Sequence, residues 1–171
     1  MKYYTGVGSR KTPTEILYLM KDFATILALK NLILRSGGAD GADREFEYGC
    51  DLVNGKKEIY LAKHCTVKAQ EIAKQFHPAW HKCSPYAQLL HGRNVFQVLG
   101  KNFDLPSSFL ICWTPDGCKT HKTRKIKTGG TGTEISIADH YNVPVYNLKR
   151  KEDLEALKLL LQESNQCLKL A

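Results

Sequence analysis

The chain has 171 residues and a formal net charge of +8, with 43% hydrophobic and 25% charged residues. This composition excludes an intrinsically disordered chain, and no apolar run reaches the ~20 residues that a membrane-spanning helix needs. The N-terminal segment MKYYTGVGSR lacks the apolar stretch of a signal peptide, so we expect a cytoplasmic protein, and the basic balance favours anionic partners such as nucleotides or nucleic acid.

Short apolar runs alternate with helical patterns along the whole chain. We expect strands over residues 2–7, 32–34, 57–61, 109–113 and 143–148. Pro13 and Thr14 open the first helix, and further helices are expected over residues 42–52, 67–76, 86–101, 134–141 and 152–163. This alternation predicts a single α/β domain of Rossmann type over residues 1–171, with a mostly parallel sheet of five or slightly more strands and helices on both faces.

The loop after the first strand is the first candidate for ligand binding. In such sheets ligands bind at the carboxyl ends of the strands. Gly8 lacks a Cβ atom, so the backbone N–H groups beside it and Ser9 can approach a phosphate or a ribose. Arg10 adds a guanidinium suited to an anion. A tight strand-to-helix turn with no ligand is the alternative interpretation of this short motif.

The loop after the second strand is also rich in glycine. Ser36, Gly37 and Gly38 lead into the helix that begins near Ala42. Asp43, close to that helix start, can accept hydrogen bonds from the hydroxyls of a bound sugar. It can also do no more than stabilise the helix dipole.

The third glycine-rich loop carries the strongest local signal in the chain. It consists of Gly129, Gly130, Thr131, Gly132 and Thr133, and it opens a helix at Glu134. Its N–H groups, its threonine hydroxyls and the helix N-terminus together predict a phosphate site. The basic loop insertion at residues 114–128 precedes it, with basic side chains from Lys119 to Lys127, and we expect that loop to be mobile without ligand.

Arg93 and Asn94 lie on the helix before the fourth strand. Their side chains either lie on the solvent-exposed surface of that helix or reach into the ligand site.

The six cysteines form no CxxC pair, which favours reduced thiols. We expect no cofactor and no metal. A zinc site remains an alternative, because histidines and cysteines recur at short spacing, at His77, His81, Cys83, Cys118 and His121.

These motifs, in this order, resemble the SLOG superfamily, which includes the Lonely Guy phosphoribohydrolases and DNA-processing protein A. The resemblance covers roughly residues 3–148 and rests on YTGVGSR, LRSGGADGADREFEYG, HGRN, FLICW, TGGTGTEISIA and VPVYNL. A compact form of this kind is similar to the stand-alone proteins of phages and mobile elements, which would act in the host cytoplasm. We also expect a homo-oligomer, a dimer or larger.

The phosphoribohydrolase branch implies hydrolysis of the N-glycosidic bond of nucleoside 5′-monophosphates. Arg93 matches its arginine, and the third glycine-rich loop matches its phosphate loop. The family's glutamate position falls on Ser136, while Glu134 lies two residues earlier, a rotation of about 200° on a helix. We take Glu134, Arg93 and Asp43 as the candidate catalytic residues.

Two other functions use the same loops. A sensor or sink for a nucleotide signal needs binding without turnover. A single-stranded DNA binder similar to DNA-processing protein A would use the basic loop and aromatic side chains such as Trp80 or Trp113, although Trp113 ends an apolar strand and is expected in the core.

Overall fold

The computed structural model describes residues 2–167, and the side chains of residues 2–162. Five strands form one sheet in the order β3-β2-β1-β4-β5, and all four neighbouring pairs are parallel. The strands are β1 (Tyr3–Gly6), β2 (Ile33–Ser36), β3 (Lys57–Ile59), β4 (Leu110–Cys112) and β5 (Val145–Asn147). The predicted five-stranded parallel sheet is therefore confirmed, with four strands shorter than expected and β2 extended to Ser36.

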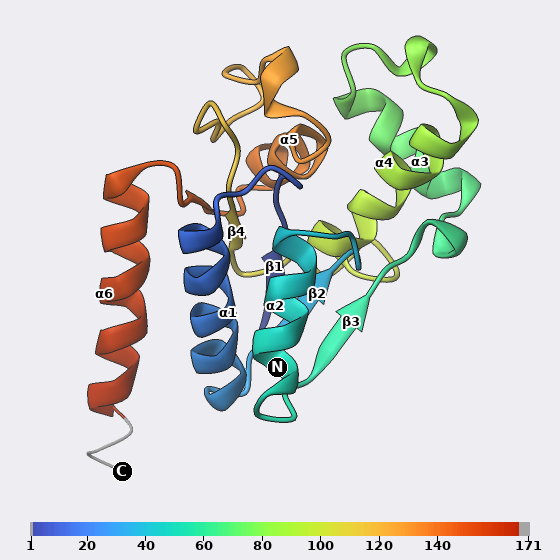
Figure 1. Cartoon of the computed structure of the whole chain (residues 1–171). Helices are drawn as coiled ribbons and strands as arrows, with labels where there is room; N and C mark the ends of the chain where they lie inside the picture. The colour runs from blue at the N-terminus through green and yellow to red at the C-terminus, as the bar shows by residue number, and fades with distance from the viewer. Residues whose placement is uncertain (1, 168–171) are drawn as a thin grey trace.

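Six α-helices connect or follow these strands (Figure 1). They are α1 (Thr14–Leu29), α2 (Ala42–Asp51), α3 (Val67–Phe76), α4 (Pro85–Leu99), α5 (Gly132–His140) and α6 (Lys151–Cys167). Short 3₁₀ turns lie at Ala62–His64, Trp80–Lys82 and Ile126–Thr128. None of the helices in the described part of the chain combines the length and the apolar character needed to cross a bilayer.

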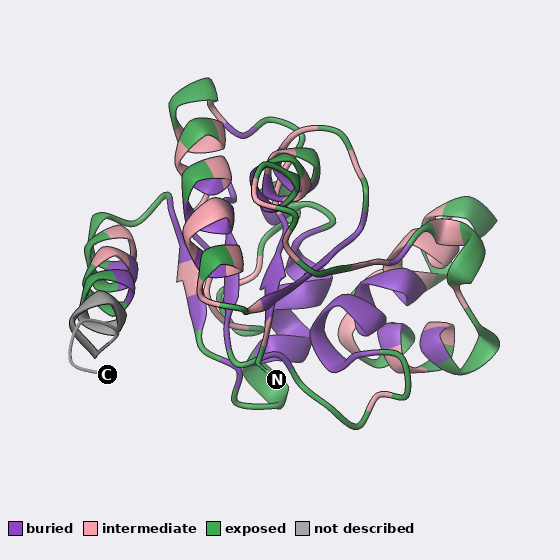
Figure 2. Cartoon of the chain, turned by 90° about the horizontal axis from the view of Figure 1, so that it is seen from below, coloured by how far each residue is buried: buried purple, intermediate pink, exposed green. Residues whose placement is uncertain are grey.

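Helices cover both faces of the sheet, and each face has its own core. Apolar side chains of α1, α2 and α6 pack on one face, around Tyr4 and Ile111. Those of α3, α4 and α5 pack on the other face, around Leu110 and Cys112. Successive residues of β4 thus point to opposite layers, as strand geometry requires. Figure 2 shows buried residues along the inner sides of the helices and exposed residues on their outer sides.

Local sequence explains where the helices that carry the site begin. The Ser84 hydroxyl accepts a hydrogen bond from the Ala87 N–H group, and Pro85 occupies the first turn of α4. Helix α5 begins at Gly132, two residues before the predicted start at Glu134. Gly129 adopts a positive φ of 71°, and the Gly132 N–H group then donates to the Gly129 carbonyl at 3.2 Å. The turn therefore closes within the glycines and places Glu134 in the first turn of the helix.

Candidate functional site

A cavity of about 660 Å³ lies where the loops after β1 and β2, helix α4 and the third glycine-rich loop meet. Residues of α4 reach it from one face of the helix, at positions 87, 90, 91 and 94, the spacing of neighbours on a helix surface. Ten of the residues predicted from the sequence line it: Gly8, Ser9, Arg10, Asp43, Arg93, Asn94, Gly129, Gly130, Thr131 and Glu134. The structure thus brings together residues that are up to about 125 positions apart in the chain.

Arg93 is buried at the floor of this cavity, with a relative exposure of 7%. Its Nη1 atom lies 3.5 Å from Asp43 Oδ2 and donates to the Tyr60 carbonyl at 3.4 Å. A Cβ atom at position 37 would lie 1.2 Å from the same nitrogen, so Gly37 leaves the space that the guanidinium fills. Of the two interpretations of Arg93, a surface residue or a residue of the site, the structure supports the second.

Glu134 is the second buried charged group of the cavity, with a relative exposure of 5%. Burial raises the pKa of its carboxyl to about 8, and Arg93 opposes that shift only in part. Gln97, with its amide turned so that donors face acceptors, donates to Glu134 Oε1 at 3.1 Å and accepts from Arg93 Nη1 at 2.5 Å. Gln97 therefore bridges the carboxyl and the guanidinium.

Glu134 lies two positions earlier than the glutamate of the superfamily pattern, and it still lines the cavity. Because α5 starts at Gly132, Glu134 faces the cavity. Ser136 is buried on another side of the helix, where it donates to the Gly132 carbonyl at 2.7 Å and lies 3.0 Å from the His121 ring. The position that matches the family's glutamate therefore has no access to this cavity, and the carboxyl two residues earlier does.

Asp43 is the second carboxyl, at the start of α2. It accepts a 3.4 Å hydrogen bond from the Ala39 N–H group and lies beside Arg93. Burial raises its pKa to about 6, while Arg93 and the Ala39 N–H group lower it. Near pH 7, most Asp43 carboxyls are ionised and most Glu134 carboxyls are protonated. Two carboxyls in one site with separated pKa values are the pattern of a base and an acid.

Three buried polar atoms of this cavity have no hydrogen-bond partner among the described residues: Arg93 Nε, Asn94 Oδ1 and Glu134 Oε2. A buried polar atom without a partner costs about 1–3 kcal/mol, so native proteins seldom keep one without a reason. Three such atoms on α4 and α5 point to a polar ligand that supplies the missing partners.

The third glycine-rich loop is open on the side of the cavity. A Cβ atom built at Gly129 or Gly130 meets nothing within 4 Å, and the Gly130 and Thr131 N–H groups donate to no other described residue. Three cations line the same cavity, on Arg10 and Lys11 of the first loop and on Lys127 just before the glycines. Free N–H groups at a helix N-terminus among cations form a place for an anion.

Five predicted ligand-binding residues lie outside the cavity lining, at Ser36, Gly37, Gly38, Gly132 and Thr133. They contact neighbouring parts of the protein. The Ser36 hydroxyl donates to the Gly6 carbonyl at 2.7 Å, and Thr133 Oγ1 lies 2.9 Å from His91 Nδ1. A Cβ atom at Gly132 would lie 2.4 Å from Arg124 Nε, so that glycine allows a close approach of the basic loop.

Residues that the sequence did not single out complete the cavity. Lys11 extends the first loop, Thr128 donates to Asp116 Oδ2 at 2.6 Å, and His91 lies two residues before Arg93. Gln97 follows Arg93 by four residues, so the i,i+4 rule would have placed it on the same face of α4. Trp113 is buried, as expected for the end of an apolar strand, and Trp80 is half-buried against a core cluster.

The predicted zinc ligands do not form one cluster. His77 and Cys83 lie together, and their third neighbour is His91, which the spacing did not suggest. Cys118 is buried and donates to the Thr120 carbonyl at 3.4 Å, while His121 contacts Ser136. His81 is exposed in the turn at Trp80–Lys82.

Comparison of the chain with protein-family models found no match, and neither did comparison with curated proteins or with solved structures. The resemblance to the SLOG superfamily therefore stays a prediction from the motifs.

Proposed function

We propose that this protein binds a nucleoside 5′-monophosphate, or a related nucleotide, and hydrolyses its N-glycosidic bond. The observation that carries the proposal is the convergence of three unpartnered buried polar atoms on one cavity, between two carboxyls and an open glycine loop. A nucleotide has the matching groups, with a phosphate at one end and a polar sugar at the other. The resemblance to the phosphoribohydrolases suggested the same substrate class.

The phosphate fits the third glycine-rich loop. There the N–H groups of Gly130 and Thr131 donate to no other described residue, and the nearby Lys127 adds positive charge. Arg10 and Lys11 line the same cavity from the first loop. A helix N-terminus favours a negative group by about 0.3–1 kcal/mol when it is exposed, and nearby cations increase that attraction. This placement leaves the sugar and the glycosidic bond over Arg93, Asp43 and Glu134.

In this arrangement one carboxyl acts as an acid and the other as a base. Glycosidic cleavage passes through an oxocarbenium-like sugar, which needs negative charge beside it and a proton for the leaving group. Protonated Glu134 gives its proton to the departing base, and the Asp43 carboxylate stabilises the positive sugar and accepts a proton from the attacking water. The bond between the sugar carbon and the base nitrogen breaks, and a bond from that carbon to the water oxygen forms. The products are the free base and the sugar 5′-phosphate.

The test is incubation with a panel of nucleoside 5′-monophosphates, read by chromatography for released base. Turnover should follow a bell-shaped pH profile, because Asp43 must be ionised and Glu134 protonated, with limits near 6 and 8. Glu134→Gln and Asp43→Asn should each lower turnover about 100-fold or more. The matched control is Glu45→Gln, at a half-buried position of α2 outside the cavity lining.

Two outcomes would replace the enzyme with another function. Nucleotide binding seen by calorimetry, without base release at any pH, would indicate a sensor or sink for a nucleotide signal. Binding of single-stranded DNA that weakens steeply with salt, without nucleotide binding, would indicate a DNA-binding protein. Its contacts would then come from the exposed Lys122, Lys125 and Lys127 of the basic loop.

A further inference from the structure

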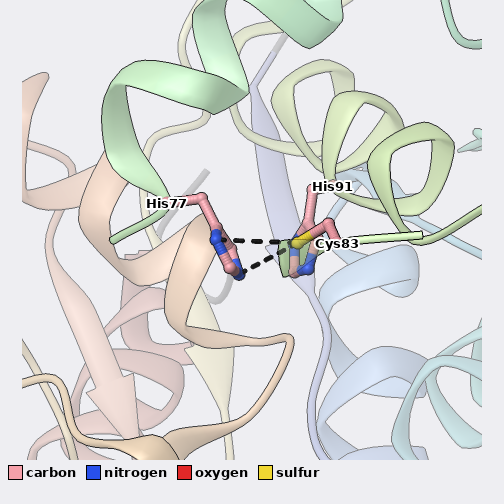
Figure 3. A group of neighbouring side chains, drawn as sticks. All are labelled: His77, Cys83 and His91. Atoms are coloured by element: carbon pink, nitrogen blue, oxygen red, sulfur yellow. Dashed lines mark hydrogen bonds between the residues drawn. The ribbon is translucent and has the colours of Figure 1, made fainter. Parts of the chain in front are cut away.

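A cluster of metal-ligating side chains lies beside the cavity and takes no part in the proposed reaction. It consists of His77, which follows α3, Cys83, which precedes α4, and His91 on α4. One ligand atom from each residue lies within 4.8 Å of the others, and all three residues are half-buried. In Figure 3 the two imidazole rings and the thiol converge on one point from three segments of the backbone.

We propose that His77, Cys83 and His91 bind one zinc ion, with the fourth position open to water. Zinc in proteins takes four ligands drawn from imidazole nitrogen and thiolate sulfur, at about 2.0–2.3 Å. Ligand atoms around such an ion are about 3.4–3.6 Å apart. Cys83 Sγ already lies 3.8 Å from His77 Nδ1 and 3.9 Å from its Nε2, so contraction by a few tenths of an ångström closes this side of the site.

The backbone around the cluster allows that contraction. His77 and Cys83 lie at the two ends of the loop between α3 and α4, which is not part of a regular helix except for the turn at Trp80–Lys82. His91 is fixed within α4, immediately before the buried part of the helix, which begins at Gly92. His91 therefore holds a fixed position on the helix, while His77 and Cys83 can move with the loop. An ion bound by all three would hold the loop against the helix.

The surroundings of His91 are those of a metal ligand. Its Nδ1 atom lies 2.9 Å from the Thr133 hydroxyl, which leaves Nε2 for the ion and fixes the ring, as outer partners of ligating histidines do.

The donor atoms of the cluster favour zinc over a hard cation. Mg²⁺ and Ca²⁺ are bound through oxygen atoms, and the cluster offers two imidazole nitrogens and one sulfur. Zinc bound to a thiolate and two imidazoles gains its affinity from those softer bonds.

The experiment uses the whole chain, purified under reducing conditions and freed of metal with a chelator, in the absence of nucleotide. Zinc is titrated against a chromophoric chelator, and cobalt is added separately to reveal a thiolate-to-cobalt charge-transfer band. The wild type should bind one zinc per chain and show the band. Cys83→Ser should lose the band and weaken zinc binding more than about 100-fold, the upper range for loss of an outer partner alone.

Cys65→Ser is the matched control, because Cys65 is also a half-buried free thiol but lies outside the cluster. It should leave stoichiometry, affinity and the cobalt band unchanged. His77→Gln provides a second variant if Cys83→Ser does not fold, and it should keep the band while weakening zinc binding. A wild type without the cobalt band, or a folded Cys83→Ser that binds zinc as tightly as the wild type, would overturn the proposal. None of these results depends on nucleotide turnover.

Discussion

Two arginines are buried among the side chains that the structure describes, and they differ in what surrounds them. Arg35, on β2, is 2% exposed. Its Nε atom donates to Glu58 Oε2 at 2.8 Å, its Nη1 atom donates to the Leu105 carbonyl at 2.6 Å, and its guanidinium lies 3.8 Å from the centre of the Tyr3 ring. The protein itself thus provides an ion-pair partner, a carbonyl and an aromatic face.

Arg93 also has one short contact, because its Nη1 atom donates to the Gln97 amide at 2.5 Å. Its contacts to Asp43 and to the Tyr60 carbonyl are longer, at 3.5 and 3.4 Å, and its Nε atom has no partner among the described residues. Its neighbour Glu134 also has an unpartnered oxygen. Because the protein satisfies the guanidinium of Arg35 and leaves the Nε atom of Arg93 without a partner, we expect Arg35 to act on stability and Arg93 on ligand binding.

The largest expected effect concerns the carboxyls beside Arg93. The folded-state pKa of Glu134 is about 8, above its ordinary 4.5, so the folded protein binds the extra proton. The contribution of this carboxyl to stability is then full below about pH 4.5 and is lost as pH rises through about 8, by an amount on the order of 5 kcal/mol. Asp43, with its pKa raised from 3.8 to about 6, adds a decline of the same sign at lower pH.

Melting curves across this pH range measure the effect. Glu134→Gln cannot ionise and should flatten the decline between about 6 and 8, while the part caused by Asp43 remains. It should also exceed the wild type in melting temperature above pH 8. Equal slopes in the two proteins would mean that Glu134 is already ionised at neutral pH, and the acid role proposed for it would fail.

Arg35→Ala should produce the next largest effect, on stability alone. The change empties a fully buried site and leaves the Leu105 carbonyl without its donor, which costs about 3 kcal/mol. Urea unfolding gives the free energy, and calorimetry with a nucleotide gives the affinity, which should stay within about twofold of the wild type under conditions where the variant is folded. A loss of affinity larger than the loss of stability would contradict the structural role of Arg35.

Arg93→Ala should reverse that pattern. Nucleotide affinity should drop at least about tenfold, or 1.4 kcal/mol, because a hydrogen bond to a charged group contributes about 1.5–3 kcal/mol. The loss of stability should be smaller than for Arg35→Ala, since Asp43 can take up a proton when its partner is removed. Arg44→Ala, at an exposed position of α2, is the control and should change neither quantity. An unchanged affinity in Arg93→Ala would remove this residue from the site.

The smallest expected effect is in the basic loop. The structure ties its first half to β5, because the Asn147 amide donates to Thr114 Oγ1 and to the Cys118 carbonyl, each at 2.8 Å. Ile126 at the other end is fully exposed, next to the cavity. Hydrogen exchange should therefore slow on nucleotide binding at residues 125–130 and stay constant at residues 117–119. Uniform slowing across residues 114–128 would favour the mobile loop expected from the sequence.

The fold was readable from the sequence because its signals are local. Apolar runs gave the strands, and period and capping gave the helices, with α3 predicted at the residues where it lies. The start of α5 was missed because Glu134 is the first good helix former after the glycines. The turn at Gly129 and its hydrogen bond to Gly132 start the helix earlier.

The site was readable only as a set of loops. The pairing of Arg93 with Asp43 joins residues 50 positions apart, and no spacing rule indicates it. Ser36 and Gly37 looked like ligand residues because glycine and serine occur in both roles, yet their neighbours from β1 and α4 use them for packing. His91 was missed as a partner of His77 and Cys83 because the loop that brings the three residues together has no regular period.

The space at Gly37 has a consequence for how this sequence can change. A methyl group there would lie 1.2 Å from Arg93 Nη1 and 2.1 Å from the end of the Gln97 side chain, so a side chain at position 37 would displace both groups. Substitutions at positions 37, 93 and 97 are therefore coupled. A descendant that keeps the guanidinium and the amide where they lie must keep the glycine, whereas one with smaller side chains at positions 93 and 97 can fill the space.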